Sequence, residues 1–181
     1  MKTLIIFFLA IVSLETFAQE SEERILYVVD SIIVVDDPEE DEGELNGMDI
    51  ETLTVITNKA DIAKYGYKDV DKVIFIITKE YLRRSDEVKR IPTTKNMERR
   101  DGRWYLLKST VPYSGQFIDY FFSGRRQGDG TMKDGLLDGK RSVYYQNGNL
   151  SYYTTYSAGI ETGESKGKMM GFGKNGIPLE S

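Results

Sequence analysis

The chain of 181 residues contains no cysteine and no histidine. Without cysteine it can form no disulfide and carry no acylated cysteine, so its stability must come from packing alone. Without histidine it lacks the commonest general base near neutral pH, a frequent zinc ligand and any Ser–His nucleophile. No pair of carboxylates is set apart by its spacing for glycoside hydrolysis either. We therefore expect a protein that is not an enzyme and uses no metal or cofactor.

Long apolar runs are also scarce. Leu4 to Val12 is apolar, but it is shorter than the about 20 residues needed to span a bilayer. Lys2 precedes this run, and the small-residue site Thr16-Phe17-Ala18 follows it, a pattern typical of a secretory signal peptide. We expect residues 1–18 to be removed near Ala18 and the protein to be periplasmic or extracellular, the alternative being an N-terminal anchor. No later run predicts a membrane span.

The net charge of -5 is unevenly distributed along the chain. Asp36 to Glu44 is acidic, but with Asp37 first, Glu42 occupies the sixth position where a calcium loop needs glycine. This favours a solvated loop over a calcium site. Residues 82–103 are basic and contain Pro92, which predicts an irregular connector that could touch anionic lipid or glycan, or pair with the acidic run. The net negative charge argues against a nucleic-acid partner.

Residues 19–81 have the pattern of a small α+β unit. Val73 to Ile77 is continuously apolar, as in a buried strand, and Asn46 or Asp49 is placed to cap a turn. Asn58 is a good N-cap. The predicted order is β-β-α-β, with a strand region at Ile25–Val35 interrupted by Asp30-Ser31, a strand at Ile50–Thr57, a helix at Lys59–Tyr65 ended by Gly66, and the strand at Val73–Ile77.

This segment resembles a known family. The motifs that carry the resemblance are Tyr27-Val28-Val29-Asp30, Asp49-Ile50-Glu51, Val55-Ile56-Thr57, Tyr65-Gly66 and Ile74-Phe75-Ile76-Ile77-Thr78-Lys79. They follow in the order seen in plug domains of TonB-dependent outer-membrane receptors, which residues 25–81 resemble. Ser31 and Asp71-Lys72 depart from the family pattern. Because a receptor barrel needs at least about eight strands, the resemblance implies a small envelope fold and not transport.

The C-terminal half contains an internal repeat with a period of 24 residues. Gly115, Gly139 and Gly163 are equally spaced, and Gly124 stands 24 residues before Gly148. The same spacing relates Gly135 to Gly159 and Tyr120 to Tyr144. In the better copy a strand at Arg141–Tyr145, a two-residue turn at Asn147-Gly148 and a return strand at Leu150–Tyr156 are predicted. We expect residues 104–181 to form an array of antiparallel β-hairpins, with Trp104–Leu107 packed under the first.

Residues 113–176 resemble the bacterial variant of the membrane occupation and recognition nexus (MORN) repeat. The resemblance rests on the Gly-x8-Gly spacing, the Tyr-Tyr-x-Asn-Gly run at Tyr144 to Gly148 and the Tyr-x-x-Gly at Tyr156 to Gly159. It implies a scaffold or interaction module, and some bacterial members are labelled antitoxin components. The predicted fold class is thus α+β, a plug-like unit followed by MORN-like hairpins.

The repeat also supplies the candidate binding residues. Because side chains alternate along a strand, we expect one row of aromatic residues to form the core and the other to face a partner. Asp119 lies in an aromatic run, but it is expected to be an outward-facing strand residue and not a catalyst. The candidate partner-binding residues are Tyr120, Tyr144, Tyr152, Tyr153 and Tyr156.

These observations predict a non-enzymatic, exported interaction protein of the cell envelope that binds a protein or an envelope surface. One alternative is a binder of small molecules, peptides or glycans through the aromatic row. The other alternative is an antitoxin-like component, against which the signal peptide argues.

Overall fold

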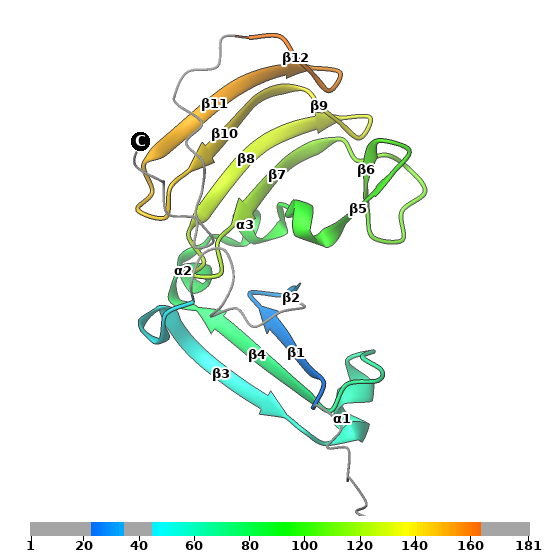
Figure 1. Cartoon of the computed structure of the whole chain (residues 1–181), viewed down its shortest axis with the longest axis vertical. Helices are drawn as coiled ribbons and strands as arrows, with labels where there is room; N and C mark the ends of the chain where they lie inside the picture. The colour runs from blue at the N-terminus through cyan, green and yellow to red at the C-terminus, as the bar shows by residue number, and fades with distance from the viewer. Residues whose placement is uncertain (1–22, 35–44, 164–181) are drawn as a thin grey trace, which may run out of the picture.

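The computed structural model describes residues 23–34 and 45–163 (Figure 1). The predicted signal peptide, the acidic run and most of the third repeat copy lie outside these residues. The described chain is mostly β, with a four-stranded sheet, a six-stranded sheet and a two-stranded hairpin.

The N-terminal sheet has the strand order β2-β1-β4-β3. β1 runs parallel to β4, whereas the other neighbours are antiparallel. The helix α1 has Asn58 as its N-cap, as the sequence predicts, and of the two candidates Asn46 and Asp49 it is Asn46 that caps the 3-10 turn η1. The elements are β1 (Ile25–Val29), β2 (Ile32–Val34), η1 (Gly47–Asp49), β3 (Ile50–Ile56), α1 (Lys59–Lys64) and β4 (Lys72–Thr78).

One part of the predicted order is wrong. Asp30 and Ser31 have φ values of 49° and 70°, and two consecutive left-handed residues reverse the chain. The interrupted run is therefore a hairpin of two strands, with Val28 opposite Ile33. The observed order is β-β-β-α-β.

Both faces of the central β1–β4 pair of the N-terminal sheet are covered, whereas β3 is exposed. On one face Ile62 of α1 packs against Val28 and Val73, all three of which are buried. On the other face Val29 and Ile76 form a second cluster with Val34 and Leu45, and Phe122 from the C-terminal sheet packs against it. Phe122 is partly buried, so it gains part of the roughly 1.5–3 kcal/mol that full burial of such a side chain contributes, and this contact helps to hold the two halves of the chain together.

The basic connector is structured, which corrects the expectation of an irregular linker. Thr78 caps the short helix that leads into the connector, and Ser85 caps the short helix within it, each accepting from a backbone N–H. Asp101 and Gly102 have φ values of 49° and 76° and turn the hairpin that follows. The elements are α2 (Lys79–Arg83), α3 (Asp86–Arg90), η2 (Thr94–Asn96), β5 (Met97–Arg100) and β6 (Arg103–Leu106).

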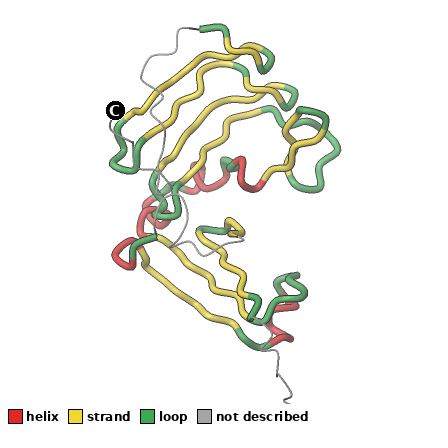
Figure 2. Tube along the Cα trace, in the orientation of Figure 1, coloured by secondary structure: helices red, strands yellow, loops and turns green. Residues whose placement is uncertain are grey.

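The C-terminal sheet has the strand order β12-β11-β10-β8-β7, with β9 paired to β8. Within the described residues every helix lies before β5 in the sequence, and only strands and loops lie after it (Figure 2). Trp104 packs with the buried Phe117 of the first hairpin, as expected, whereas Leu106 and Leu107 are exposed. The elements are β7 (Gly115–Tyr120), β8 (Arg126–Lys133), β9 (Leu136–Leu137), β10 (Gly139–Tyr144), β11 (Leu150–Ser157) and β12 (Ile160–Glu161).

The 24-residue period of the sequence is also a period of backbone geometry. Gly124 and Gly148 have φ values of 82° and 85°, and Gly135 and Gly159 have 75° and 80°. The hydrogen bonds repeat as well. The amide of Gly124 donates to Phe121 O at 2.9 Å, and that of Gly148 donates to Tyr145 O at 2.9 Å. The described repeat therefore contains two copies of one hairpin unit.

The turn within each copy differs from the predicted two-residue type. Of the pair Asn147-Gly148, only Gly148 has a positive φ. The amide of Tyr145 donates to Asn149 O at 2.9 Å, and the pairing register shifts between Val143 and Tyr144. The turn is therefore longer than two residues, and it places Gly148 in the left-handed position of a bulge.

Gly130 explains why the first copy looks weaker in sequence. It lies opposite Phe117, and a Cβ at this position would come within 2.9 Å of the Phe117 ring. Phe117 is 1% exposed, so the glycine makes room for a core side chain of the first copy.

Candidate functional site

The five candidate tyrosines divide between the two faces of the C-terminal sheet. Directly opposite residues of paired strands share a face. Tyr152 lies opposite Val143 and Tyr156 opposite Gly139, which places both tyrosines on one face. Tyr153 lies opposite Ser142, on the other face, and alternation along their strands places Tyr144 and Tyr120 there too. The tyrosines therefore do not form one row.

Tyr120 is the buried member of the set, with 8% of its surface exposed. The Arg84 guanidinium lies over its ring, 3.5 Å from the centroid. Burial raises the pKa of the Tyr120 phenol, an effect partly opposed by the nearby Arg84 and Arg126 charges. Its hydroxyl has no hydrogen-bond partner among the described residues. Tyr120 is thus a packing residue at the junction between the two sheets.

The other four tyrosines are half-buried, and cations lie beside two of them. Lys140 Nζ is 4.1 Å from the Tyr153 ring centroid, and the Arg126 guanidinium is 6.0 Å from that of Tyr144. These four side chains leave aromatic surface exposed on both faces of the β10–β11 end of the sheet. Such surface can stack on a sugar ring or pack against an apolar partner side chain.

A groove of about 290 Å³ opens on the face that carries Tyr153. Val88 and Ile91, in and just after α3, form its apolar wall. Arg126, Asp129 and Lys140 supply charge, and an ion pair of 3.5 Å joins Arg126 to Asp129. The groove could hold a small polar ligand against the sheet.

A second cluster lies where the two sheets meet, and sequence reasoning missed it. The Asp30 carboxylate accepts from the Thr78 amide at 2.8 Å and from the Thr78 hydroxyl at 2.6 Å. Arg84 lies 3.5 Å from Asp30 and donates to Gly124 O at 2.6 Å. Because 54 residues separate Asp30 from Arg84, neither period nor spacing signals their pairing.

The electrostatics of this junction indicate a structural role. Burial raises the pKa of Asp30, although the Thr78 hydrogen bonds and the Arg84 charge oppose the shift. Burial likewise lowers the pKa of Arg84. The adjoining cavity of about 190 Å³ is small, and both charged groups already have protein partners. The cluster therefore fastens the first repeat copy to the N-terminal sheet.

Asp119 is buried, contrary to the prediction that it faces outward. It is 9% exposed, and its Oδ1 accepts at 2.8 Å from the Thr93 hydroxyl, the Thr94 amide and the Thr94 hydroxyl. The connector folds over this part of β7, since the amide of Ile118 also donates to Pro92 O at 3.0 Å. Sequence alone could not place Thr93 and Thr94 beside β7.

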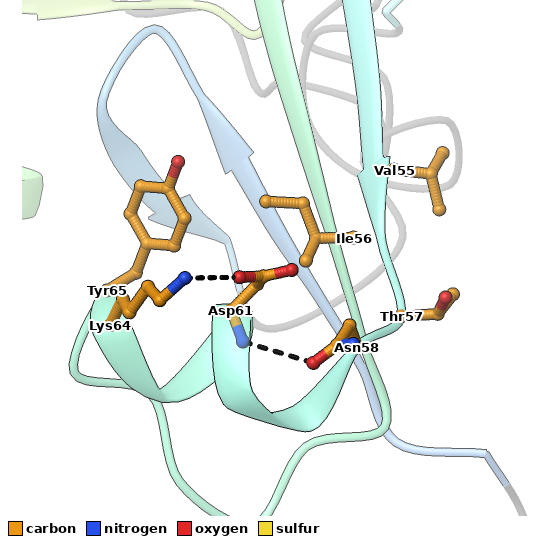
Figure 3. A pocket seen from close by; sticks show the side chains of 7 residues that line it. All are labelled: Val55, Ile56, Thr57, Asn58, Asp61, Lys64 and Tyr65. Carbon is orange, nitrogen blue, oxygen red and sulfur yellow. Dashed lines mark hydrogen bonds and ion pairs between the residues drawn. The ribbon is translucent and has the colours of Figure 1, made fainter.

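A third cavity, of about 490 Å³, lies beside α1 and the C-terminal end of β3 (Figure 3). Asn58 caps α1, and Asp61 forms an ion pair of 2.7 Å with Lys64, so these polar groups are already engaged. Figure 3 shows Tyr65 and Val55 on opposite sides of β3. Within the described residues no cluster of acidic side chains is suited to hold a metal ion.

Comparisons with known proteins give no family assignment. No family model, curated protein or solved structure matches the chain. Among the helices of the described segments, none has the length and apolarity needed to cross a membrane.

Proposed function

We propose that this chain is a non-enzymatic, exported interaction protein of the cell envelope. Its binding surface is the β10–β11 end of the C-terminal sheet, and its partner is a protein or an envelope surface. The observation that carries the proposal is the set of four half-buried tyrosines, Tyr144, Tyr152, Tyr153 and Tyr156, gathered on this end of the sheet.

The energetics of interfaces support this choice. Tyrosine is enriched among the residues that dominate binding energy, because its large ring loses little conformational entropy when it is fixed. The first copy is covered by α3, η2 and the β5–β6 hairpin, whereas the second copy extends away from them (Figure 1). Among the described residues, the second copy is therefore the more accessible part of the repeat.

The sequence resemblances point in the same direction. A MORN-like repeat at residues 113–176 is typical of scaffolds, and a plug-like unit at residues 25–81 fits the envelope. The pattern of residues 1–18 supports export and cleavage near Ala18. On this proposal the mature chain comprises the plug-like unit, the connector and the repeat.

Affinity capture tests the proposal. The mature chain, residues 19–181, is immobilised and exposed to envelope extract beside the variants Tyr152→Ser/Tyr156→Ser and Tyr144→Ser/Tyr153→Ser. We expect the variant that alters the binding face to recover roughly tenfold less partner. Tyr105→Ser, a half-buried tyrosine outside this sheet, is the matched control and should retain capture.

Two results would refute the proposal. One is equal capture by the wild type and both double variants, all shown to be folded by circular dichroism. The other is saturable hydrolysis of a defined substrate by the purified chain, which would identify an enzyme.

The groove beside Tyr153 favours a second candidate, a binder of small polar molecules or glycans. Lys140 and Arg126 could donate hydrogen bonds to hydroxyl or carboxylate oxygens while the Tyr153 ring stacks on a sugar face. A thermal-shift screen of charged and neutral oligosaccharides distinguishes the candidates, because a ligand of the native state raises the melting temperature. A shift that Lys140→Ala abolishes would favour the glycan binder.

A further inference from the structure

Among the described residues, the edge strand β3 is open along its length. It is the last strand of the N-terminal sheet and pairs on one side with β4 (Figure 1). All five residues from Glu51 to Val55 are exposed, including Leu53 at 53% and Val55 at 48%. Within the described residues no strand pairs with its outer side.

This edge lacks most of the features that prevent strands from pairing between molecules. β3 contains no proline and no lysine, and Glu51 is its one charged residue. A bulge lies between Ile50 and Thr52, but pairing with β4 is regular from Thr52 to Ile56. A regular, apolar edge of this kind is a template for another strand. The edge of β7, in contrast, is occupied by Pro92 through its bond to the Ile118 amide.

We propose that β3 pairs with β3 of a second copy of this chain, antiparallel and centred on Leu53. The two four-stranded sheets then become one continuous sheet across a two-fold axis. This inference goes beyond the proposed function and does not depend on it, because no partner is needed to form the pair.

The sequence of β3 is self-complementary in this register. Leu53 meets Leu53 of the second copy and Thr52 meets Thr54, while Glu51, at the bulge, does not face its own copy. Apolar and Thr–Thr pairs directly opposite each other stabilise antiparallel strands. Leu53 already lies opposite Ile76 of β4, so pairing continues an Ile–Leu–Leu–Ile row across the axis.

The residues that flank β3 also fit the arrangement. Met48 lies two residues before β3 and Asn58 lies two residues after it, so antiparallel pairing brings the Met48 end of one strand near the Asn58 end of the other. Met48 is 75% exposed, and Asn58 and Tyr65 line the cavity of about 490 Å³ at the end of β3 (Figure 3). A flexible methionine side chain suits an irregular gap of this kind. Each copy thus presents an apolar side chain beside a cavity of the other.

Oligomeric state is the first measurement. Sedimentation equilibrium of the mature chain should show a monomer–dimer equilibrium, and Leu53→Lys should weaken dimerisation by roughly tenfold or more, since a lysine would face its own copy. Val111→Lys, which alters a loop residue that is 69% exposed, should leave the dimer unchanged. A monomer at all concentrations, or a dimer that Leu53→Lys does not weaken, would overturn the proposal.

Cysteine cross-linking then tests the register, because the natural chain has no cysteine. Opposite residues of antiparallel strands have Cα atoms about 4.5–5.5 Å apart, within the range of a disulfide. Leu53→Cys should therefore oxidise rapidly to a covalent dimer, whereas Ile56→Cys, which would lie opposite Ile50, should not. Equal cross-linking rates for the two variants would contradict pairing centred on Leu53. This outcome includes the case in which β3 binds a different partner strand.

Discussion

At the scale of single residues, side chains that bond to amides a few positions away shape the local turns of the chain. The two caps, Asn46 and Asn58, could be predicted because their side chains bond to amides two or three residues away. The burial of Asp119 could not, since its partners Thr93 and Thr94 are 25 or more residues distant. Among the candidate tyrosines, the sequence could not predict that Arg84 would cover Tyr120.

Asp71 provides a prediction about pH. The Lys59 ammonium, 2.5 Å away, and the Arg24 amide lower its pKa from 3.8 to about 2. The folded state binds the proton of the Asp71 carboxyl more weakly than the unfolded chain does. The stabilisation from ionised Asp71 is therefore present above pH 3.8 and is lost as the pH falls through about 2. Lys59→Ala should return the Asp71 pKa toward 3.8, measured by carboxyl-carbon NMR titration.

The matched control is Lys64→Ala, because Lys64 pairs with Asp61 and not with Asp71. Its Asp71 titration should coincide with that of the wild type. If Lys59→Ala left the titration of Asp71 unchanged, the assigned ion pair would be wrong.

At the scale of elements, the sequence predicts the hairpins of the repeat but does not predict the short helices and the hairpin of the connector. Glycines at positive φ recur with the period of the repeat, and this period can be recognised in a single sequence. The connector carried signals too: Thr78 and Ser85 as N-caps, acidic first turns and basic last turns, and the turn dipeptide Asp101-Gly102. The two helices have five residues each, which is too short to show a helical period of apolar residues. The many charged residues around them also hide that pattern.

The attachment of the connector to β7 yields a second prediction. Asp119→Ala removes three hydrogen bonds and leaves the buried Thr93 hydroxyl without its acceptor, so we expect it to lower the free energy of unfolding by about 2–3 kcal/mol. Asp129→Ala removes a partly exposed ion pair with Arg126 and should cost at most about 1 kcal/mol. Urea denaturation measures both. Equal losses would show that the connector is not held by Asp119.

At the scale of the whole molecule, the two sheets are joined through the turn of the first repeat copy. Phe122 enters the apolar cluster of the N-terminal sheet, and Gly124 accepts from Arg84. These contacts depend on a tertiary arrangement that leaves no local pattern, so the sequence predicts the β-rich character and hairpins of the chain but not this junction. The repeat therefore has one copy docked and one copy extending outward, which gives the second copy its accessible tyrosines.

Gly124 and Gly148 test this asymmetry most directly. Alanine in either left-handed turn should cost about 1–2 kcal/mol in backbone strain. Only at Gly124 would the added Cβ collide with Thr78 and come within 3.0 Å of the Glu80 Cβ, whereas at Gly148 it meets nothing within 4 Å. We predict from urea unfolding that Gly124→Ala is less stable than Gly148→Ala by about 1–3 kcal/mol. Equal free energies of unfolding for the two variants would contradict the docking of the first copy.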